Sequence, residues 1–157
     1  MTRASAQVDL AAIRANLDLV RGLAGSASVM AVVKADAYGH GIVAIAREAR
    51  HWGAEWLGVA LPSEACQLRS AGDTGRILAW LWTPGDPAID SCVAEGVDLS
   101  VSSRWALDEV VAAARRSGLP ARVQVKIDTG LSRNGITVEE WPTLLDEVLA
   151  AQDSGHI

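Results

Sequence analysis

The stretch Val29-Met30-Ala31-Val32-Val33-Lys34-Ala35-Asp36-Ala37-Tyr38-Gly39-His40-Gly41 contains the pattern on which the rest of the chain is built. A short apolar run ends at a lysine, a loop with two glycines follows, and an amphipathic segment begins near residue 41. An apolar run without alternation is typical of a strand that is covered on both faces. The stretch therefore predicts a buried strand, a polar loop and a helix, in that order.

The same alternation of short apolar runs and amphipathic segments continues on both sides of this stretch. An earlier helix starts at Asp9, which is a plausible N-cap. Because a helical segment separates each strand from the next, the strands are expected to run parallel and to be joined by right-handed crossovers. Strands are predicted at 28–33, 56–60, 76–81, 97–101 and 122–127, and further helices near 41–51, 62–71, 86–95, 103–116 and 138–151.

Two architectures fit this order of elements, an open doubly wound sheet and a (β/α) barrel. Lys34 and Lys126 lie at the ends of two different predicted strands, and functional residues at the carboxyl ends of several strands are typical of a barrel. A closed barrel has eight strands and about 250 residues. We therefore predict an α/β fold in which residues 1–157 form the N-terminal part of a (β/α)8 TIM-type barrel, with about five of the eight β/α units.

The last residues, 153–157, look like the approach to another strand. The rest of the barrel is therefore expected to lie outside this chain, and strand edges and apolar helix faces are expected to be exposed. Ser103 is the predicted N-cap of the clearest helix, Gly118 is predicted to end it, and Thr137 and Glu140 have the spacing of a capping box. The predicted buried face of the first helix contains Leu10, Ile13, Leu17 and Val20.

The composition excludes several classes of protein. Half of the residues are hydrophobic and the net charge is −5, which is typical of a globular protein. A chain without a basic block is not expected to bind nucleic acid, and no apolar run approaches the ~20 residues that cross a bilayer. Residues 1–5 lead into no signal-peptide core. Cys66 and Cys92 lack metal-ligand spacing, so we expect no metal site and reduced thiols in a cytoplasmic protein.

Lysine is scarce in this chain, which has two lysines against twelve arginines. Codon bias alone could produce this ratio. However, arginine cannot do what a lysine amine does, which is to lose its proton and form a Schiff base. Two lysines at the ends of two strands therefore suggest that amine chemistry is needed there.

Residues 33–41 resemble the pyridoxal-phosphate attachment motif of the alanine racemases, which are fold-type III enzymes with an N-terminal barrel and a C-terminal β domain. Other segments are similar to the same family in the same order, so the resemblance covers the whole chain as the front part of a longer enzyme. These segments are 8–10, 12–16, 57–60 with Glu64 and Ala65, and 126–135.

The resemblance implies roles for three side chains. Lys34 would hold pyridoxal 5'-phosphate as a Schiff base and act as one of two acid–base groups at the substrate Cα. Tyr38 would donate a hydrogen bond to the cofactor phosphate, and Arg133 would lie against the cofactor's phenolic oxygen and the substrate carboxylate. Outside such a motif, the same residues would be an ordinary strand-end lysine, a core aromatic and a surface salt-bridge partner.

Lys126 corresponds to a lysine that many family members carry as a carbamate, whose negative charge orients the arginine. Unmodified, Lys126 could instead pair with Asp128 or Asp36. Many members have glycine where this chain has Ser132, and the serine is expected to tighten the loop. Structural rather than catalytic roles are expected for Asp128, Thr129 and His40.

The resemblance implies interconversion of L-alanine and D-alanine, with D-alanine supplied for cell-wall peptidoglycan. It also implies a homodimer in which a tyrosine of the partner's C-terminal domain is the second base. That tyrosine and the other cofactor ligands lie outside this chain, so the chain alone is expected to be inactive. The alternatives are another fold-type III racemase or decarboxylase, which the motif at 34–41 disfavours, and a non-catalytic pyridoxal-phosphate-binding barrel, which the length of the native reading frame would distinguish.

Overall fold

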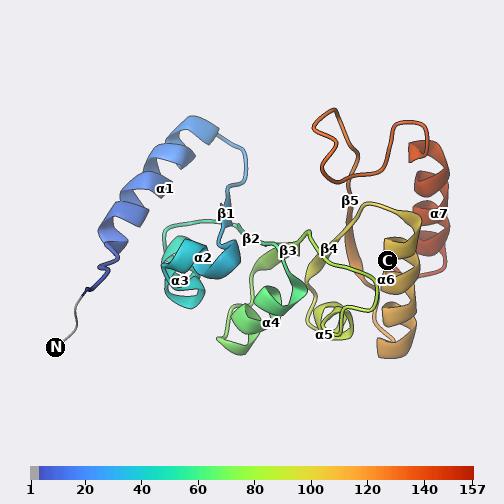
Figure 1. The fold of residues 1–157 in the computed structure, drawn as a ribbon, viewed down its shortest axis with the longest axis horizontal. Coiled ribbons are helices and arrows are strands. Elements are labelled where there is room, and N and C mark those ends of the chain that lie inside the picture. Colours follow the sequence, from blue (N-terminus) through green and yellow to red (C-terminus); the bar gives the residue numbers. More distant parts are fainter. Residues whose placement is uncertain (1–3) are drawn as a thin grey trace.

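The computed structural model describes residues 4–157 and contains one parallel β-sheet with helices packed along it (Figure 1). Residues 1–3, part of the segment expected to lead into no signal-peptide core, lie outside the described residues. The strands lie in the order β1-β2-β3-β4-β5, and each neighbouring pair is parallel. Their bounds are β1 Met30–Val32, β2 Trp56–Val59, β3 Arg76–Ala79, β4 Asp98–Val101 and β5 Arg122–Val125.

One helix precedes the first strand, and helical segments follow each strand. Within residues 4–157, no helix has the length and apolar composition needed to cross a membrane. The bounds are α1 Leu10–Ala24, α2 Lys34–Gly39, α3 Ile42–His51, α4 Pro62–Ser70, α5 Ile89–Ala94, α6 Arg104–Ser117 and α7 Trp141–Asp153.

The sequential strand order separates the two candidate architectures. A doubly wound sheet reverses its strand order at a switch point, whereas here each strand pairs with the next one along the chain. The helices from α3 to α7 likewise contact one another in chain order. The sheet is therefore the N-terminal part of a (β/α) barrel, as predicted, with β1 and β5 as its two edges.

The predicted elements are present, but their boundaries differ. Each strand is shorter than its predicted range, because the apolar runs continue into the turns that follow or precede the paired residues. Helix α5 begins at Ile89 rather than at residue 86, because the Asp86 carboxylate accepts the Ala88 N–H and forms a turn there. Helix α7 begins at Trp141 rather than at residue 138. Thr137 accepts the N–H of Glu140, so this predicted capping pair forms in the turn before the helix.

The helix-covered face of the sheet forms the core. Leu57, Ile77 and Leu99 are fully buried, and Leu57 and Ile77 are paired across β2 and β3. Side chains alternate between the two faces of a strand, and Gly58 follows the buried Leu57 in β2. Val32, which pairs with Gly58, therefore points to the other face of the sheet. Val32 is 50% exposed. The inner face of the barrel is therefore open at the edge strand β1, as expected for an incomplete barrel.

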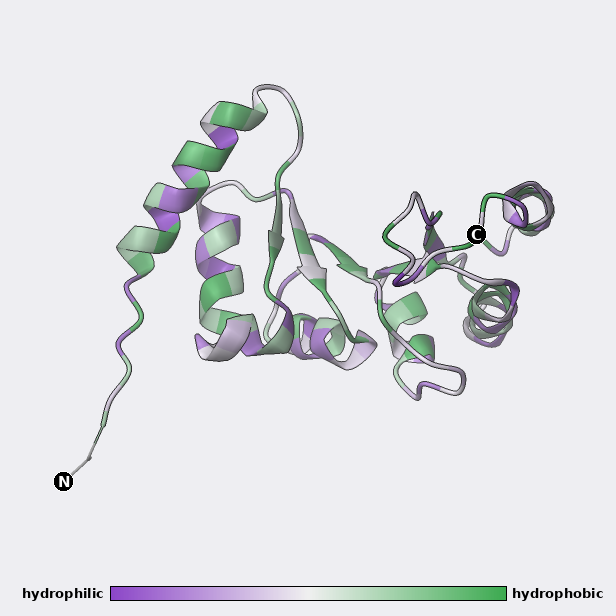
Figure 2. Ribbon diagram, turned by 45° about the horizontal axis from the view of Figure 1, so that its top comes forward, coloured by the Kyte–Doolittle hydropathy of each residue, from purple (hydrophilic) through white to green (hydrophobic). Residues whose placement is uncertain are grey.

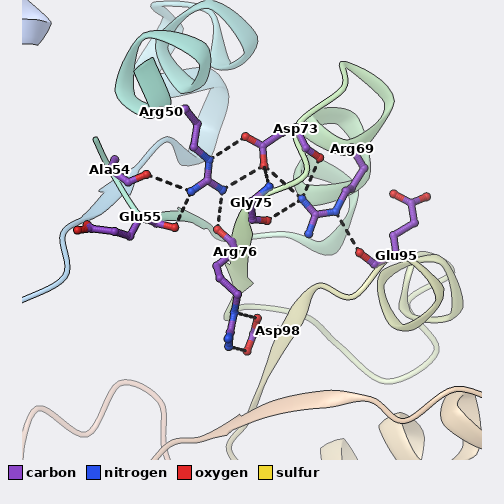
Figure 3. Close-up of polar contacts among 9 residues, drawn as sticks. All are labelled: Arg50, Ala54, Glu55, Arg69, Asp73, Gly75, Arg76, Glu95 and Asp98. Carbon is purple, nitrogen blue, oxygen red and sulfur yellow. Dashed lines mark hydrogen bonds and ion pairs between the residues drawn. The ribbon is translucent and has the colours of Figure 1, made fainter. Parts of the chain in front are cut away.

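A charged network occupies the inner face at the amino ends of the strands. Asp98 is only 1% exposed, and its carboxylate accepts hydrogen bonds from Arg76 at 3.1 and 2.6 Å (Figure 3). Arg122 lies 3.5 Å from the same carboxylate, and Gln124 donates to it at 3.3 Å. The Arg76 guanidinium also stacks on Trp56, at 4.1 Å from the ring centroid. A buried carboxylate is tolerated only when it is paired and hydrogen-bonded, and these side chains meet that requirement.

A second network joins successive β/α units at the same end of the sheet. Asp73 accepts two hydrogen bonds from Arg50, at 2.8 and 3.0 Å, and one from Arg69 at 3.2 Å (Figure 3). Arg50 also donates to backbone carbonyls of Ala54, Glu55 and Arg76, and so reaches the starts of β2 and β3. The planar fork of arginine allows one side chain to make all these bonds.

Helix α1 begins as predicted, because the Asp9 carboxylate accepts the N–H groups of the first turn. The helix packs against α3, and only part of its predicted face is covered. Leu17 is buried, but Leu10 and Val20 are 39% and 48% exposed. Apolar residues thus remain on the outer side of this helix, which stands apart from the sheet (Figure 2).

The predicted caps of α6 are both present. The Ser103 hydroxyl accepts the Ala106 N–H at 3.4 Å, and Gly118 ends the helix with a left-handed φ of +67°. Glycine adopts that conformation without the steric penalty of a Cβ.

Candidate active site

Lys34 follows β1 after one residue and begins α2, which has an unusual backbone. The four residues 35–38 all have φ between 51° and 56°, so α2 contains a left-handed turn. For L-amino acids this conformation costs roughly 1–2 kcal/mol per residue, and none of the four is glycine. The sequence predicted a loop here but gave no sign of a left-handed turn. Such strain tends to be found at functional sites.

Hydrogen bonds within the segment support this turn. The Ala37 N–H donates to the Val33 carbonyl at 2.9 Å. The Asp36 carboxylate accepts the N–H of Ile42 at 2.7 Å, which joins the turn to the first residue of α3. The His40 ring nitrogen Nδ1 lies 2.7 Å from the Ala37 carbonyl oxygen. His40 therefore contacts the backbone of the turn, in keeping with the structural role expected for it.

The left-handed turn brings Tyr38 beside Lys34. The Lys34 Nζ atom lies 5.6 Å from the centroid of the Tyr38 ring, within the range of a cation–π contact. Tyr38 is 68% exposed, and Lys34 is partly buried. An amine and a phenol thus lie together at the carboxyl end of β1, where barrel proteins carry their reactive groups.

Arg133 lies in a loop at the carboxyl end of β5. The loop closes on itself through a bridge between Ile127 and Ile136, in which the Ile136 N–H donates to the Lys126 carbonyl at 2.9 Å. Gly135 makes this closure possible, because a Cβ at that position would lie 2.5 Å from the Asp128 backbone nitrogen. The exposed Arg133 is therefore presented by a loop with a defined backbone.

The Asp128 carboxylate organises the same loop from inside. One of its oxygens accepts the N–H groups of Gly130 and Ser132, both at 2.9 Å. These two bonds favour the charged carboxylate and lower the pKa of Asp128 below its ordinary value. Asp128 thus shapes the loop, as expected.

Ser132 has a φ of +55°, which is a left-handed conformation that glycine adopts more readily. This geometry explains why a glycine would fit at position 132. The backbone angle shows that the serine introduces strain, and its tightening of the loop stays a prediction.

Lys126 lies at the base of this loop, where its backbone N–H donates to the Val101 carbonyl at 2.8 Å. After the hydrogen bonds from Gly130 and Ser132, its positive charge also contributes to the low pKa of Asp128. Among residues 4–157, however, Lys126 forms no ion pair with either Asp128 or Asp36.

The structure brings some of the predicted site residues together and keeps others apart. Lys34 and Tyr38 are neighbours, whereas Arg133 and Lys126 follow β5, with three strands between β5 and β1. All four residues lie after the carboxyl end of a strand. A cleft of about 520 Å³ between α3 and the loop after α4 contains none of them. The chain therefore presents two parts of a site on the two edges of the sheet.

The strand order and the position of these residues define the class of protein. It is a (β/α)-barrel protein, of which this chain is the front part, with an amine, a phenol and a guanidinium at the carboxyl ends of its edge strands. Residues 8–155 match the family model described as alanine racemase, N-terminal domain. The chain belongs to the alanine racemase family.

Individual relatives agree with this assignment. The chain is 54% identical to the alanine racemase of Beutenbergia cavernae over 154 residues, covering 98% of this chain and 40% of that protein. It is 51% identical to the alanine racemase of Streptomyces coelicolor over 158 residues, with the same two coverages. The crystal structure of alanine racemase from Streptomyces lavendulae has a TM-score of 0.93 at 52% identity, covering 95% of this chain and 39% of that one.

The chain spans about 40% of the length of these curated relatives. The match in each case is with a part of the relative rather than with the whole protein.

The residues present fit pyridoxal phosphate, as judged by their chemistry and exposure. Lys34 supplies the primary amine that condenses with an aldehyde. Tyr38 supplies a hydroxyl that can donate a hydrogen bond, on a side chain that is 68% exposed and directly beside that amine. Arg133 supplies an exposed guanidinium suited to anionic oxygens. The donors at the β1 end suit an aldehyde that carries a phosphate.

Proposed function

We propose that this chain is the N-terminal barrel part of a pyridoxal-phosphate-dependent alanine racemase, with residues 1–157 as a partial barrel domain. The observation that carries the proposal is the left-handed turn after β1, which places the Lys34 amine beside the Tyr38 phenol. A strained backbone at the end of a barrel strand, with an amine at its start, is expected where that amine reacts. The similarity to alanine racemases over nearly the whole chain supports the same function.

Each of the three side chains has a defined task in this proposal. Pyridoxal phosphate, when bound, stabilises the negative charge that develops at the substrate Cα as its proton leaves. Lys34 would hold the cofactor through its amine, and the same amine would move a proton at one face of the substrate Cα. Tyr38 would donate a hydrogen bond to the phosphate, and Arg133 would orient the carboxylate of alanine. Lys126, as a carbamate, would be a negatively charged partner for Arg133.

Racemisation needs a second acid–base group on the opposite face of Cα. We assign this group to a tyrosine of the partner subunit in a homodimer, carried by a C-terminal β domain that is not in residues 1–157. The remaining strands of the barrel would bring the β5 loop toward the β1 end by closing the sheet. The chain alone should therefore not interconvert L- and D-alanine.

The complete enzyme would work in the cytoplasm, and its product, D-alanine, would be used for peptidoglycan. The two cysteines fit this location, because they are free thiols in the structure. The Cys66 and Cys92 sulfurs lie 3.9 Å apart, at the distance of a thiol hydrogen bond.

The scarcity of lysine makes the central claim testable on this chain. Wild type, Lys34→Arg and Lys126→Arg would be incubated with pyridoxal phosphate, reduced with borohydride and analysed by peptide mass spectrometry. We expect the cofactor on Lys34 in the wild type and in Lys126→Arg, and none at position 34 in Lys34→Arg. Lys126→Arg is the matched control, because it removes the only other lysine.

The result that would overturn the proposal is cofactor trapped mainly on Lys126 or on the terminal amine of the wild type. Measurable production of D-alanine by the 157-residue chain would contradict the assignment of the second base. Loss of D-alanine formation in Lys34→Ala of the family-length protein would support the role of Lys34 in turnover.

A further inference from the structure

Glu64 makes a long-range contact with the residue that follows Lys34. It lies in the first turn of α4, in the second β/α unit, and is partly buried. One carboxylate oxygen, Oε1, accepts the Ala35 N–H at 2.5 Å. The other oxygen, Oε2, accepts the N–H groups of Ala60 and Leu61, both at 2.9 Å. A single carboxylate thus joins the start of α4 to the turn after β1.

Two of these three bonds have a local explanation. A glutamate at the third position of a helix often accepts the N–H of the N-cap residue, and Leu61 is the N-cap of α4. The bond to Ala35 is different, because it spans 29 residues. In the described part of the chain, the other hydrogen bonds of residues 35–40 are made within residues 33–42. Glu64 is therefore the hydrogen-bond anchor of this turn to the next β/α unit.

The anchored turn is the strained part of the backbone. Residues 35–38 have left-handed φ values without glycine, so this conformation requires support from its surroundings. The Ala35 N–H is the first donor of the turn, and the carboxylate fixes it in space. Because Ala35 is bonded to Lys34 through one peptide unit, fixing its N–H also fixes the direction in which the Lys34 side chain leaves the backbone.

We propose that Glu64 is a positioning residue for Lys34: its carboxylate holds the left-handed turn against the β2–α4 connection, and so orients the amine for covalent attachment of the cofactor. This inference rests on the proposed function of Lys34. Glu64 itself touches neither the amine nor the reacting atoms in this assignment. Its action passes through the Ala35 backbone.

The opposite end of β1 provides a matched control. The Glu55 carboxylate accepts the Val29 N–H at 2.7 Å, just before β1 begins. Glu55 and Glu64 therefore each bind one backbone N–H next to the same edge strand, from the two ends of β2. Only Glu64 is at the lysine end. Loss of a carboxylate at Glu55 should leave the Lys34 turn unchanged.

Glutamine is the informative replacement at both positions, because it preserves the shape of the side chain and removes one acceptor. At Glu64 all three partners are N–H donors, so an amide must turn its NH2 group toward at least one of them. Either orientation leaves a donor facing a donor. At Glu55 a single backbone donor is involved, and the amide oxygen can still accept it.

The experiment compares wild type, Glu64→Gln and Glu55→Gln of this chain by two measurements. The first is hydrogen exchange at the Ala35 amide by NMR, which we expect to accelerate at least roughly tenfold in Glu64→Gln only. The second is the yield and pH dependence of borohydride-trapped pyridoxal phosphate on Lys34. We expect a roughly tenfold lower yield in Glu64→Gln, with global stability near that of Glu55→Gln.

The outcomes separate this inference from the proposed function. If Lys34 of the wild type traps no cofactor, the proposed function fails, and the Ala35 exchange rate alone decides whether Glu64 holds the turn. If the wild type reacts and Glu64→Gln matches it in both measurements, the positioning role is overturned. If Glu64→Gln does not fold, the scalar coupling across the Ala35–Glu64 hydrogen bond in the wild type decides, because its absence would refute the contact.

Discussion

Gly135 offers a quantitative test of the loop that presents Arg133. Its φ is +134°, and a Cβ at this position would lie 2.5 Å from the Asp128 nitrogen and 2.8 Å from the Ile127 carbonyl carbon. Both are backbone atoms of the segment that pairs with Ile136. The clash therefore cannot be relieved by the rotation of a side chain. Gly135→Ala must open the bridge or shift the loop.

The magnitude follows from a comparison with Gly130 in the same loop. Gly130 has a φ of +129°, but a Cβ there would meet no heavy atom within 4 Å. Gly130→Ala should lower the free energy of unfolding by about 1 kcal/mol, because it introduces backbone strain alone. Gly135→Ala adds a clash of the kind that costs about 1–3 kcal/mol in packed sites. The two variants should therefore differ by about 1–3 kcal/mol.

Urea denaturation of wild type, Gly130→Ala and Gly135→Ala would measure this difference, with thermal unfolding as a second assay. For a chain of this size, each kcal/mol corresponds to about 2–4 °C in the melting temperature. Equal destabilisation by the two variants, or a larger effect of Gly130→Ala, would refute the conclusion that the backbone contact at Gly135 closes the loop.

Three further predictions concern charge and reactivity. The low pKa of Asp128 means that its carboxylate stabilises the folded state above pH 3.8 and that this contribution is lost as the pH falls below that value. Asp128→Asn should therefore be less stable than wild type at pH 7, with a shallower loss of stability as the pH falls below 3.8 in urea titrations; parallel curves would contradict this. Burial raises the pKa of Cys92 and that of Cys66 above their ordinary values. Iodoacetamide at pH 7.5 should therefore label these thiols much more slowly in the folded chain than in urea. Equal labelling rates would refute this prediction. Asp98→Ala should lower the free energy of unfolding by about 1–3 kcal/mol, because Arg76 and Arg122 lose their buried partner. The loss is limited because both arginine side chains are about 40% exposed and keep contact with water. Unchanged urea midpoints would show that the network adds no stability.

The fold could be predicted from the sequence because its determinants are local. Apolar runs mark the strands, and caps such as Ser103 and Gly118 mark the ends of a helix with the correct residues. The strand order could be inferred only from where Lys34 and Lys126 fall, since periodicity does not distinguish a barrel from a doubly wound sheet. The structure confirms the barrel order directly.

The left-handed turn could not be predicted, for a physical reason. Alanines at positions 35 and 37 favour a right-handed conformation, so local preference opposes the observed backbone. The support comes partly from Glu64, which lies 29 residues away from Ala35 in the sequence. The strain at Ser132 was missed in a similar way, because a serine gives no signal of positive φ.

The candidate site could be predicted at the level of which residues lie after which strand. Lys34 and Tyr38 are adjacent in the structure, as the short spacing between them suggests. The sequence leaves open a pairing of unmodified Lys126 with Asp128 or Asp36. No such ion pair forms among residues 4–157, and side-chain direction of this kind cannot be read from the sequence. The resemblance of residues 33–41 to alanine racemases agrees with the family found for the whole chain.

The arginine–aspartate networks at the amino ends of the strands have a consequence for how such a protein can change over time. Arg50, Arg69 and Asp73 hold successive units together without using any residue of the opposite, lysine-bearing end. Substitutions in the loops after β1 and β5, apart from the turn at residues 35–38 and the glycines of the β5 loop, therefore leave these networks intact. Selection for a new substrate can therefore act on the carboxyl ends of the strands. The networks at the amino ends must be kept, because they maintain the fold.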